Sequence, residues 1–259
     1  MRKTIGALKL SLLRRFKMTT LAHPLITITN IIWSFDPATK QVNVLLIKRS
    51  DQPFAGYWAL PETAMREGES AHEAALRLVR EKIGLRLDAG YAEQLATFTA
   101  ADRDPSERAL SLSYMIYLPQ RPPLVPGPGA SDAEWFALSR QPGGIFTFNY
   151  QRLRFYSLKA DEYLTDQTPT TGLAFDHNWI LTVACSRIRN KLDYQPTILF
   201  ILGDSFTLKQ ARLIFAEFGR IEPDNSNFLR NHAAMLKPTG VTAKAGVGRP
   251  SKTYVLTLR

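Results

Sequence analysis

The chain has 259 residues, of which 45% are hydrophobic and 22% are charged, as expected of a folded protein with one large domain or two ordinary ones. The single cysteine excludes a disulfide framework and a cysteine-rich zinc site and fits a reducing compartment such as the cytoplasm, and no apolar run approaches the roughly 20 residues of a membrane-spanning helix. The net charge of +10 is concentrated at the two ends of the chain: residues 1–17 carry six Lys or Arg and no acidic residue, and residues 194–259 carry nine Lys or Arg and four Asp or Glu. This distribution predicts an anionic partner for the C-terminal part, with nucleic acid as the first candidate. No membrane partner is expected.

Residues 1–17 are basic and only weakly apolar, and they show neither the continuous apolar core nor the cleavage site of a signal peptide. Two interpretations of this segment stay open. It is either the product of an upstream start codon, with Met18 as the natural start, or a basic arm that contacts nucleic acid or a membrane surface. We therefore set residues 1–20 apart from the folded domains, as a disordered arm or a misassigned start.

Runs of β-branched and aromatic residues predict five strands in the first half of the chain, over residues 25–33, 42–48, 93–99, 109–118 and 133–138. Apolar residues at helical spacing predict one helix over residues 70–83, with Ser70 as its N-cap and Gly84 as its stop. Strands interrupted by a single helix indicate one mixed α/β (α+β) unit that ends near residue 138.

The second half begins with an ambiguous segment, residues 139–172, because its aromatic runs at 146–150 and 153–158 fit either a hairpin or a short helix. A long helix is predicted next, over residues 175–192, in the position of a connector between two domains. The remaining elements are an apolar run at 197–202, a helix from 205 to about 219, a helix at 227–236, a glycine-punctuated stretch at 241–247 and a strand at 253–258. Helix, turn, helix and basic hairpin form the layout of a winged helix-turn-helix domain. The predicted organisation is a domain at 21–172, a connector at 173–193 and a second domain at 194–259.

A long spaced motif surrounds the first predicted helix. The stretch 53–61 reads Pro-Phe-x-Gly-x-Trp-x-Leu-Pro, and Glu69, Arg77, Glu81 and the pair Gly84-Leu85 follow at fixed intervals. These residues resemble a Nudix box, whose pattern is Gly, five residues, Glu, seven residues, Arg-Glu, an apolar residue, any residue, Glu-Glu, any residue, Gly and an apolar residue. The chain departs from this pattern at Thr63 for Gly, at Leu78 for Glu and at Lys82 for Glu, and the Gly pair after Pro61 has become Glu62-Thr63.

The resemblance implies a Nudix fold, and the departures imply altered chemistry. Nudix hydrolysis needs carboxylates on one helix face, because divalent metals must bridge a pyrophosphate and activate water. Leu78 removes one of these carboxylates and Lys82 places a positive charge where a cation belongs. We therefore expect a domain that binds a nucleotide without hydrolysing it, with no catalytic residue, no metal site and no cofactor. A Nudix hydrolase that acts on ADP-ribose or a similar nucleoside diphosphate derivative is the alternative.

The candidate ligand-binding residues are Arg49, Trp58, Glu69, Arg77, Glu81 and Arg103. The sequence Asp-Arg-Asp-Pro at 102–105 resembles a loop of Nudix proteins that recognise ADP-ribose, and an arginine there or at position 49 can meet a phosphate with two hydrogen bonds. Trp58 can stack on a base. The structural alternatives stay open: Glu69 and Arg77 pin the loop to the helix, the other two arginines are solvated, and Trp58 belongs to the core.

Four further motifs follow in order, Leu-Ala-Phe-Asp-His at 173–177, Phe-Thr-Leu at 206–208, Asn-Phe-x-Arg at 227–230 and Gly-Arg-Pro-Ser-Lys-x-Tyr at 248–254. Together with the altered Nudix box, they resemble the Nudix-related transcriptional regulators of NAD metabolism over nearly the whole chain from about residue 25, with residues 139–172 as an insertion. The resemblance implies a repressor that binds a palindromic double-stranded DNA operator as a homodimer, with ADP-ribose or a related nucleotide as the effector that releases it. Relatives of this architecture also regulate sugar catabolism, and an RNA-binding or purely structural module is a third interpretation.

The candidate DNA-binding residues lie on the last predicted helix and on the basic hairpin. The helix offers polar side chains to base edges, namely Asn225, Ser226, Asn227, Arg230 and Asn231. The hairpin offers charge to phosphates, through Lys237, Lys244, Arg249 and Lys252. Phe228, Ala234 and Leu236 are expected in the core, and His232 is expected at the surface, either on a phosphate or without a role.

Structural roles are expected for three residues of the connector. Asp176 and His177 are expected to hold the connector by hydrogen bonds, because no Cys or His lies near His177 in the sequence to share a metal. Cys185 is expected to be a small buried hydrophobe inside the helix.

Overall fold

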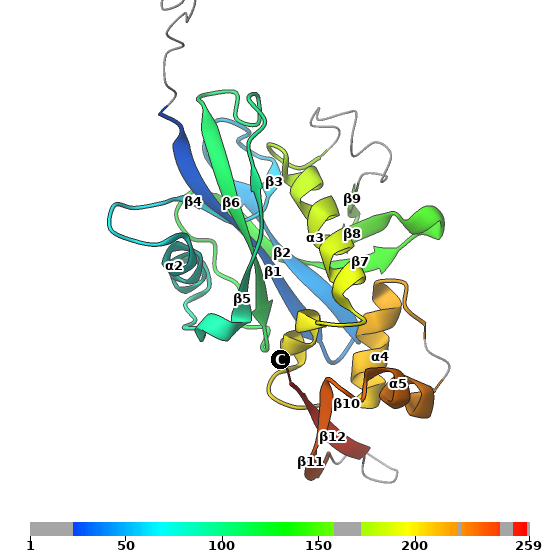
Figure 1. Cartoon of the computed structure of the whole chain (residues 1–259). Coiled ribbons are helices and arrows are strands. Elements are labelled where there is room, and N and C mark those ends of the chain that lie inside the picture. Colours follow the sequence, from blue (N-terminus) through cyan, green and yellow to red (C-terminus); the bar gives the residue numbers. More distant parts are fainter. Residues whose placement is uncertain (1–22, 158–171, 222–223, 244–250, 258–259) are drawn as a thin grey trace, which may run out of the picture.

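The computed structural model describes residues 23–157, 172–221, 224–243 and 251–257. In this part of the chain a large mixed sheet is followed by a smaller unit of short helices and a three-stranded sheet (Figure 1). The strands of the large sheet are β1 (Leu25–Asp36), β2 (Gln41–Arg49), β3 (Trp58–Ala59), β4 (Glu62–Ala64), β5 (Ala92–Phe98), β6 (Ala109–Leu118), β7 (Ala130–Arg140), β8 (Phe146–Tyr150) and β9 (Leu153–Tyr156). Two short 3-10 helices, η1 (Ala89–Tyr91) and η2 (Pro142–Gly144), lie between them.

The large sheet has the strand order β5-β6-β1-β2-β7-β8-β9, with β3 paired to β2 and β4 paired to β1. β1 runs parallel to β6 and antiparallel to β2. The five predicted strands are confirmed. The ambiguous segment forms a hairpin at residues 146–150 and 153–156, β8 and β9, that extends the sheet. Residues 158–171 lie outside the described residues.

Helices cover both faces of the large sheet (Figure 1). On one face, Ile28 and Ile32 of β1 pack into a cluster with Ala74 and Ala75 of α2 (Ala71–Ile83). On the other face, Ile31, Trp33 and Phe35 of β1 share a cluster with Ile180 and neighbouring residues of α3 (His177–Lys191). β1 is thus buried on both sides, and its residues 27–35 are all buried although four of them are polar.

The ends of α2 follow from its sequence. Ser70 is the N-cap, and its hydroxyl accepts a hydrogen bond from the backbone N–H of Glu73 while the Glu73 carboxylate accepts one from the N–H of Ser70. Gly84 ends the helix with a φ of +79°, a left-handed conformation that glycine adopts without strain. The predicted helix and both of its caps are confirmed.

The C-terminal unit has the order expected of a winged helix domain. Its elements are η4 (Thr197–Leu202), β10 (Phe206–Thr207), α4 (Leu208–Glu217), α5 (Asn225–His232), β11 (Leu236–Ala243) and β12 (Ser251–Leu256). β12 lies between β10 and β11 in a small antiparallel sheet. The apolar run at 197–202 is a 3-10 helix, and α5 ends at His232, four residues before the predicted end, because the chain turns there into β11.

The C-terminal unit packs directly onto the large sheet. The ring of Phe218, at the end of α4, lies 6.1 Å from the ring of Trp33 and 5.8 Å from that of Phe146. Gly219 follows with a φ of +84°, and a Cβ there would lie 2.9 Å from the guanidinium carbon of Arg140. The apolar cluster that contains the α3 face of the sheet therefore continues into the core of the C-terminal unit. The predicted domain boundaries at residues 172 and 193 remain predictions.

Candidate ligand site and nucleic-acid interface

The Nudix-like segment is held together by the guanidinium of Arg77. Its Nε and Nη2 donate to the two carboxylate oxygens of Glu69 at 2.8 and 2.7 Å, and its Nη1 donates to Glu81 at 3.0 Å. Nη2 also donates to the carbonyl oxygen of Ala64 at 3.0 Å. The side chain of Arg77 is buried, and its hydrogen bond is the main cause that lowers the pKa of Glu69 to about 2. These contacts have the geometry of the structural alternative for Glu69 and Arg77, in which the two residues connect the loop to the helix by an ion pair.

The carboxylates that remain in this segment already have cationic partners. Glu81 pairs with Arg66 at 3.1 Å in addition to Arg77. Leu78 is fully buried, and the ammonium of Lys82 donates to the carbonyl oxygen of Pro128. In the described part of the chain no group of three or more His, Cys, Asp or Glu side chains is placed to hold a metal ion. The residues present at the Nudix helix therefore do not fit the divalent metal that a Nudix hydrolase uses.

A second group of charged residues is buried where α3 meets the sheet. Arg103, in the loop after β5, donates from Nε and Nη2 to the two carboxylate oxygens of Asp176 at 3.1 and 3.0 Å. Its Nη2 also lies 3.7 Å from Oε2 of Glu62, which accepts a 2.6 Å hydrogen bond from the hydroxyl of Thr29. Burial raises the pKa of Glu62, but His177, Thr29 and Arg103 lower it by more, to about 2. Glu62 is therefore held as an anion next to the start of α3.

His177, the first residue of α3, joins this group from a fully buried position. Its Nδ1 accepts a 2.9 Å hydrogen bond from the backbone N–H of Leu60, so its ring proton is on Nε2. Nε2 lies 3.8 Å from Oε2 of Glu62 and has no closer hydrogen-bond partner among the described residues. The expectation that Asp176 and His177 hold the connector by hydrogen bonds is confirmed.

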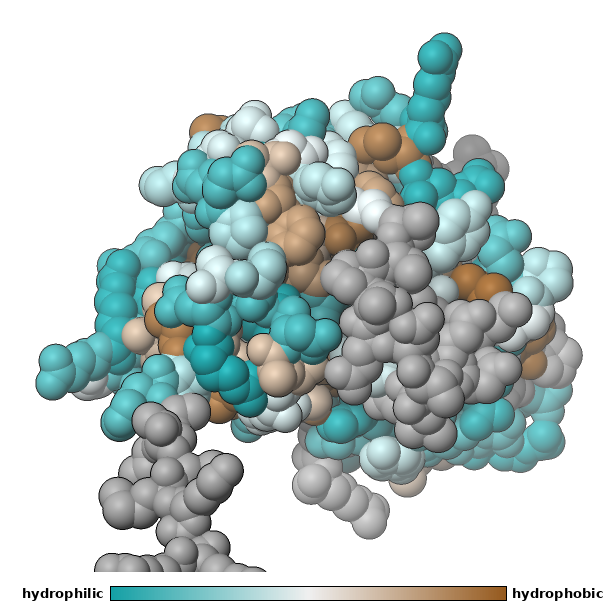
Figure 2. Space-filling model, turned by 90° about the horizontal axis from the view of Figure 1, so that it is seen from above, coloured by the Kyte–Doolittle hydropathy of each residue, from teal (hydrophilic) through white to brown (hydrophobic). Residues whose placement is uncertain are grey.

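Aromatic residues lie beside this group, around Arg49. The Arg49 guanidinium lies 4.8 Å from the ring centre of Phe175, and the Phe54 ring lies 4.9 Å from the same ring. Phe54 and Phe175 both have positive φ angles, +65° and +55°, a strained conformation for bulky residues that is concentrated at functional sites. Tyr57 packs on Phe54 and is half exposed. Seen from above, apolar residues gather at the middle of one end of the molecule and are bordered by hydrophilic ones (Figure 2).

The six ligand-binding candidates fall into three places. Glu69, Arg77 and Glu81 form one ion-pair network, and Arg49 and Arg103 lie at the aromatic residues and at the start of α3. Trp58 is 7% exposed and its ring lies 5.0 Å from that of Phe136, so it belongs to the core. Sequence reasoning gave no role to three further residues of this region, Glu62, Phe54 and Phe175. For Glu62 the signal was the exchange of a glycine for a carboxylate after Pro61, because a carboxylate there needs partners once it is taken from solvent. Phe54 and Phe175 stand inside the motifs at 53–61 and 173–177, but the motifs alone do not indicate their contact.

The other end of α3 is fixed by a second buried charge. The ammonium of Lys191 donates to Glu93 of β5, and the other carboxylate oxygen of Glu93 accepts a 2.9 Å hydrogen bond from Thr197, the first residue of η4. The hydroxyl of Tyr117 lies 2.9 Å from that of Thr197, and burial and then Glu93 raise the pKa of Tyr117. The large sheet, the connector helix and the C-terminal unit thus meet in one polar network.

The candidate DNA-binding residues of the helix lie on α5 or next to its N-cap, Asp224. Asp224 accepts from the backbone N–H and from the side chain of Asn227 at 2.8 and 2.9 Å. Asn225 accepts a 3.0 Å hydrogen bond from Arg212 of α4. The other three, Ser226, Arg230 and Asn231, are exposed. The N-terminal part of α5 therefore presents polar side chains to solvent, while Phe228 faces the core and is fully buried.

The hairpin contributes a second part of this surface. Lys252 of β12 and Asn225 line one hollow of about 220 Å³, together with Thr207, Leu208, Lys209, Ser251 and Tyr254. Lys237 on β11 is exposed. Lys244 and Arg249 lie outside the described residues. The structure thus brings residues of the predicted recognition helix and of the hairpin to one site.

Two expectations for the C-terminal unit are wrong, whereas the expected burial of Leu236 in this unit and of Cys185 in α3 is confirmed. His232 is 4% exposed and packs between the rings of Phe215 and Phe228 at 4.9 and 4.5 Å, so it is a core residue and not a surface histidine. Ala234 is exposed, because α5 ends before it. Leu236 and Cys185 are buried as expected, and burial raises the pKa of the Cys185 thiol.

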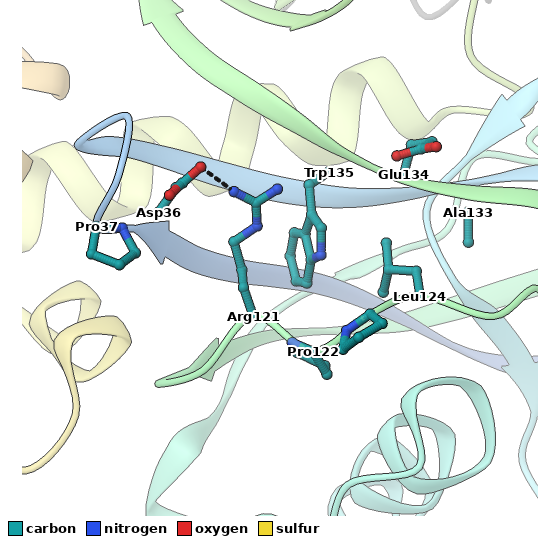
Figure 3. Close-up of a pocket in the computed structure, with 9 residues that line it drawn as sticks. Asp36, Pro37, Arg121, Pro122, Leu124, Ala133, Glu134 and Trp135 are labelled. Carbon is teal, nitrogen blue, oxygen red and sulfur yellow. Dashed lines mark hydrogen bonds and ion pairs between the residues drawn. The ribbon is translucent and has the colours of Figure 1, made fainter.

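A separate hollow of about 610 Å³ lies between the β1–β2 turn and the proline-rich loop before β7 (Figure 3). Arg121 pairs with Asp36 in it and lies 5.6 Å from the ring centre of Trp135. None of the candidate ligand-binding residues lines this hollow. It is therefore not the site that the Nudix-like segment predicts.

Comparison with known protein families identifies both units. Residues 27–151 match the NUDIX domain, and residues 198–256 match the NrtR DNA-binding winged helix domain. The predicted fold, a Nudix domain followed by a winged helix domain, is confirmed. In the described part of the chain no helix is both long and apolar enough to cross a membrane.

Individual relatives include regulators and hydrolases. The chain is 28% identical over 205 residues to the ADPR responsive transcriptional repressor NtrR of Acinetobacter baylyi, across 78% of this chain and 70% of the relative. It is 32% identical over 120 residues to the ADP-ribose pyrophosphatase of Methanocaldococcus jannaschii, across 46% of this chain and 66% of the relative. A MutT/nudix family protein from Enterococcus faecalis has a similar structure, with a TM-score of 0.77 at 28% identity over 97% of this chain and 93% of that one. The structure of Shewanella oneidensis NrtR gives a TM-score of 0.65 at 25% identity over 90% and 94% of the two chains.

Proposed function

Because the chain belongs to the NrtR-type regulators, in which a Nudix domain is joined to a DNA-binding winged helix domain, we propose that it is a transcriptional repressor whose Nudix domain senses ADP-ribose or a related nucleotide. The A. baylyi relative, which matches 78% of this chain, is an ADPR responsive transcriptional repressor. Control of NAD cofactor metabolism is the role that fits such an effector. A regulator of this kind acts in the cytoplasm.

The observation that carries the sensor role is the neutralised Nudix box. Arg77 holds Glu69 and Glu81, and Leu78 and Lys82 stand where the family pattern has carboxylates. Hydrolysis through a metal-activated water needs several of these oxygens free to bind divalent cations. We infer that the domain binds its nucleotide and releases it unchanged.

Hydrolysis of ADP-ribose is the second candidate function, since the M. jannaschii relative is a pyrophosphatase. The two functions are separated by incubating the full-length protein with ADP-ribose and magnesium. We expect no formation of AMP and ribose phosphate above the level of the buffer. Clear turnover that depends on magnesium would establish the hydrolase and remove the sensor-only function.

The DNA-binding half of the proposal uses α5 as the recognition helix. We propose that its exposed polar residues, Ser226, Arg230 and Asn231, reach base edges in the major groove. Lys252, and Arg249 outside the described residues, would meet phosphates. A homodimer would present two such helices to a palindromic operator, one for each half-site. Sedimentation of the free protein and of its DNA complex checks the dimer.

The proposed regulation works through α3. Arg103 and Asp176 fix its first turn beside the candidate ligand site, and Lys191 and Glu93 fix its last turn beside the winged helix domain. A nucleotide phosphate that draws Arg103 away from Asp176 would free the start of α3. Such a ligand binds one arrangement of the two domains more tightly than the other. Because the favoured arrangement binds DNA less well, the ligand lowers the affinity of the protein for DNA.

The function is tested by a mobility shift with DNA from the region upstream of the protein's own gene. A repressor binds this DNA with a strong dependence on salt concentration and releases it when ADP-ribose is added. Equal affinity for double-stranded RNA or for unrelated DNA of the same length would favour a nonspecific nucleic-acid-binding module instead.

A further inference from the structure

The last turn of α2 carries Lys82 at a position where the Nudix pattern has a carboxylate. Its ammonium donates a hydrogen bond to the carbonyl oxygen of Pro128, in the loop before β7. Burial lowers the pKa of Lys82, while the carboxylates of Glu81 and Asp51 raise it. Three segments that are distant in the chain therefore meet at one cation: the end of α2, the loop after β2 and the loop before β7.

Two glycines bring the loop before β7 this close. A Cβ at Gly127 would lie 3.2 Å from Cδ of Lys82, and a Cβ at Gly129 would lie 3.5 Å from Oδ2 of Asp51. Gly129 also has a φ of +77°, and its carbonyl oxygen accepts a 3.1 Å hydrogen bond from the N–H of Ser50. The backbone of the loop thus lies against the lysine side chain at Gly127 and against Asp51 at Gly129.

The net charge of the Nudix-like segment is also more positive than that of the family pattern. Leu78 removes one negative charge from the family pattern and Lys82 exchanges a negative charge for a positive one, so the box is three charges more positive. The carboxylates that remain are paired with arginines, Glu69 with Arg77 and Glu81 with Arg66 and Arg77. A divalent ion in a Nudix hydrolase brings two positive charges to the same helix. The two substitutions in this protein add three positive charges to the segment, which is at least as much as the divalent ion would bring.

We propose that Lys82 takes the place of the divalent metal, so that the Nudix domain binds the diphosphate group of its nucleotide directly and without a metal ion. This inference rests on the proposed function, because it concerns the same effector. An ammonium has three N–H donors, one of which goes to Pro128, and it binds phosphate oxygens as a compact charge. A lysine in place of the glutamate at position 82 therefore has two effects: it removes the metal that would activate a water, and it keeps a positive charge that binds the phosphates. The sensor then responds to its nucleotide whatever the magnesium concentration.

If Lys82 had only a structural role, it would hold α2 to the loop before β7. Its substitution would then not change how nucleotide binding depends on magnesium. Charge reversal separates the two roles. In Lys82→Glu the helix regains a carboxylate beside Glu81, and the phosphates then need a cation to bind next to it. Lys82→Gln removes the charge but keeps a donor for the carbonyl oxygen of Pro128. Arg80→Gln is the matched control, because Arg80 lies on the same helix, is exposed and loses the same charge.

The experiment is a calorimetric titration of the full-length protein with ADP-ribose, once with excess magnesium and once with excess EDTA. For the wild type and for Arg80→Gln, we expect affinities that agree within about twofold between the two buffers. For Lys82→Gln, we expect a loss of about tenfold or more in both buffers, the usual effect of removing a charged hydrogen bond. For Lys82→Glu, we expect binding only with magnesium.

Two outcomes would overturn this inference and leave the effector in place: wild-type binding that requires magnesium, or a Lys82→Gln protein that binds as tightly as Arg80→Gln. The wild-type comparison needs no variant, so it holds even if charge reversal impairs folding. Absence of ADP-ribose binding by the wild type in both buffers would instead overturn the proposed effector, and this inference with it. Binding of DNA, measured separately, distinguishes that outcome from an inactive preparation.

Discussion

Arg103 donates two hydrogen bonds, 3.1 and 3.0 Å long, to the carboxylate of Asp176, the residue that precedes α3. The two residues are 73 positions apart in the chain, and the side chain of Arg103 is 1% exposed. The pair joins the loop after β5 to the start of the helix that leads to the winged helix domain. The pair is a structural contact, and in the proposed regulation it is the contact that a nucleotide phosphate would break.

Asp176→Ala leaves a buried guanidinium without its main partner. Removing one member of a buried ion pair costs about 3 kcal/mol, so we expect the free energy of unfolding in urea to fall by about that amount. Asp102→Ala is the control, because Asp102 is exposed in the same loop as Arg103 and surface substitutions change stability by about 0.5 kcal/mol or less. Equal stability of the two variants would show that the pair does not fix α3.

Glu93→Gln weakens the contact of β5 with Lys191 and Thr197 at the other end of α3. We expect ADP-ribose to bind this variant with an affinity within about twofold of wild type. The factor by which ADP-ribose lowers the DNA affinity should be about tenfold smaller than in wild type, because the coupling free energy between two such sites typically corresponds to a factor of about that size. The measurement is the DNA dissociation constant with and without ADP-ribose. Arg189→Gln, an exposed change on the same helix, should behave as wild type. An unchanged factor in Glu93→Gln would remove α3 from the regulatory route.

Glu62 makes stability depend on pH. Its pKa of about 2 in the folded protein is lower than its ordinary value of 4.5, so its contribution to stability is complete above about pH 5 and is lost as the pH falls toward 2. The difference in unfolding free energy between wild type and Glu62→Gln should therefore shrink by roughly 1 kcal/mol between about pH 7 and pH 4. Urea unfolding of both proteins at the two pH values measures it. A difference that stays constant would mean that the carboxylate is not held as an anion by His177, Thr29 and Arg103.

The hairpin is predicted to bind phosphates. Arg249→Ala and Lys252→Ala should each weaken DNA binding at moderate salt and reduce the slope of log affinity against log salt by about 1, as expected for one lost phosphate contact. Arg86→Ala, an exposed change on the Nudix domain, should leave the slope unchanged. Unchanged affinity and slope in both hairpin variants would exclude the hairpin from the DNA interface.

Features fixed by local sequence were predictable. The caps of α2 at Ser70 and Gly84 are read directly from the chain, because a serine N-cap with Glu73 three residues later and a closing glycine act within one turn. The start of α3 was placed two residues too early, at 175. Phe175 takes a φ of +55°, which a phenylalanine adopts only under tertiary constraint, so no local pattern indicates it.

The candidate site depends on contacts that no spacing rule contains. Arg103 was identified as a candidate, but its partner Asp176 comes from another element far along the chain. Glu62 was noted only as a departure from the Nudix pattern, and its partial burial follows from the pairing of β4 with β1. His232 was placed at the surface because it lies among polar residues, whereas α5 turns it between two phenylalanines. Residue types were informative about chemistry, and packing decided which of them remain available to a ligand.

The most direct test of the central claim is fluorescence anisotropy of labelled upstream DNA bound by the full-length protein and titrated with ADP-ribose, followed by chromatography of the nucleotide. A ligand-responsive repressor predicts that the anisotropy falls to that of free DNA as the nucleotide saturates the protein, and that the ADP-ribose is recovered intact. Anisotropy that stays at the bound value at saturating ADP-ribose, or recovery of the nucleotide as its hydrolysis products, would contradict it.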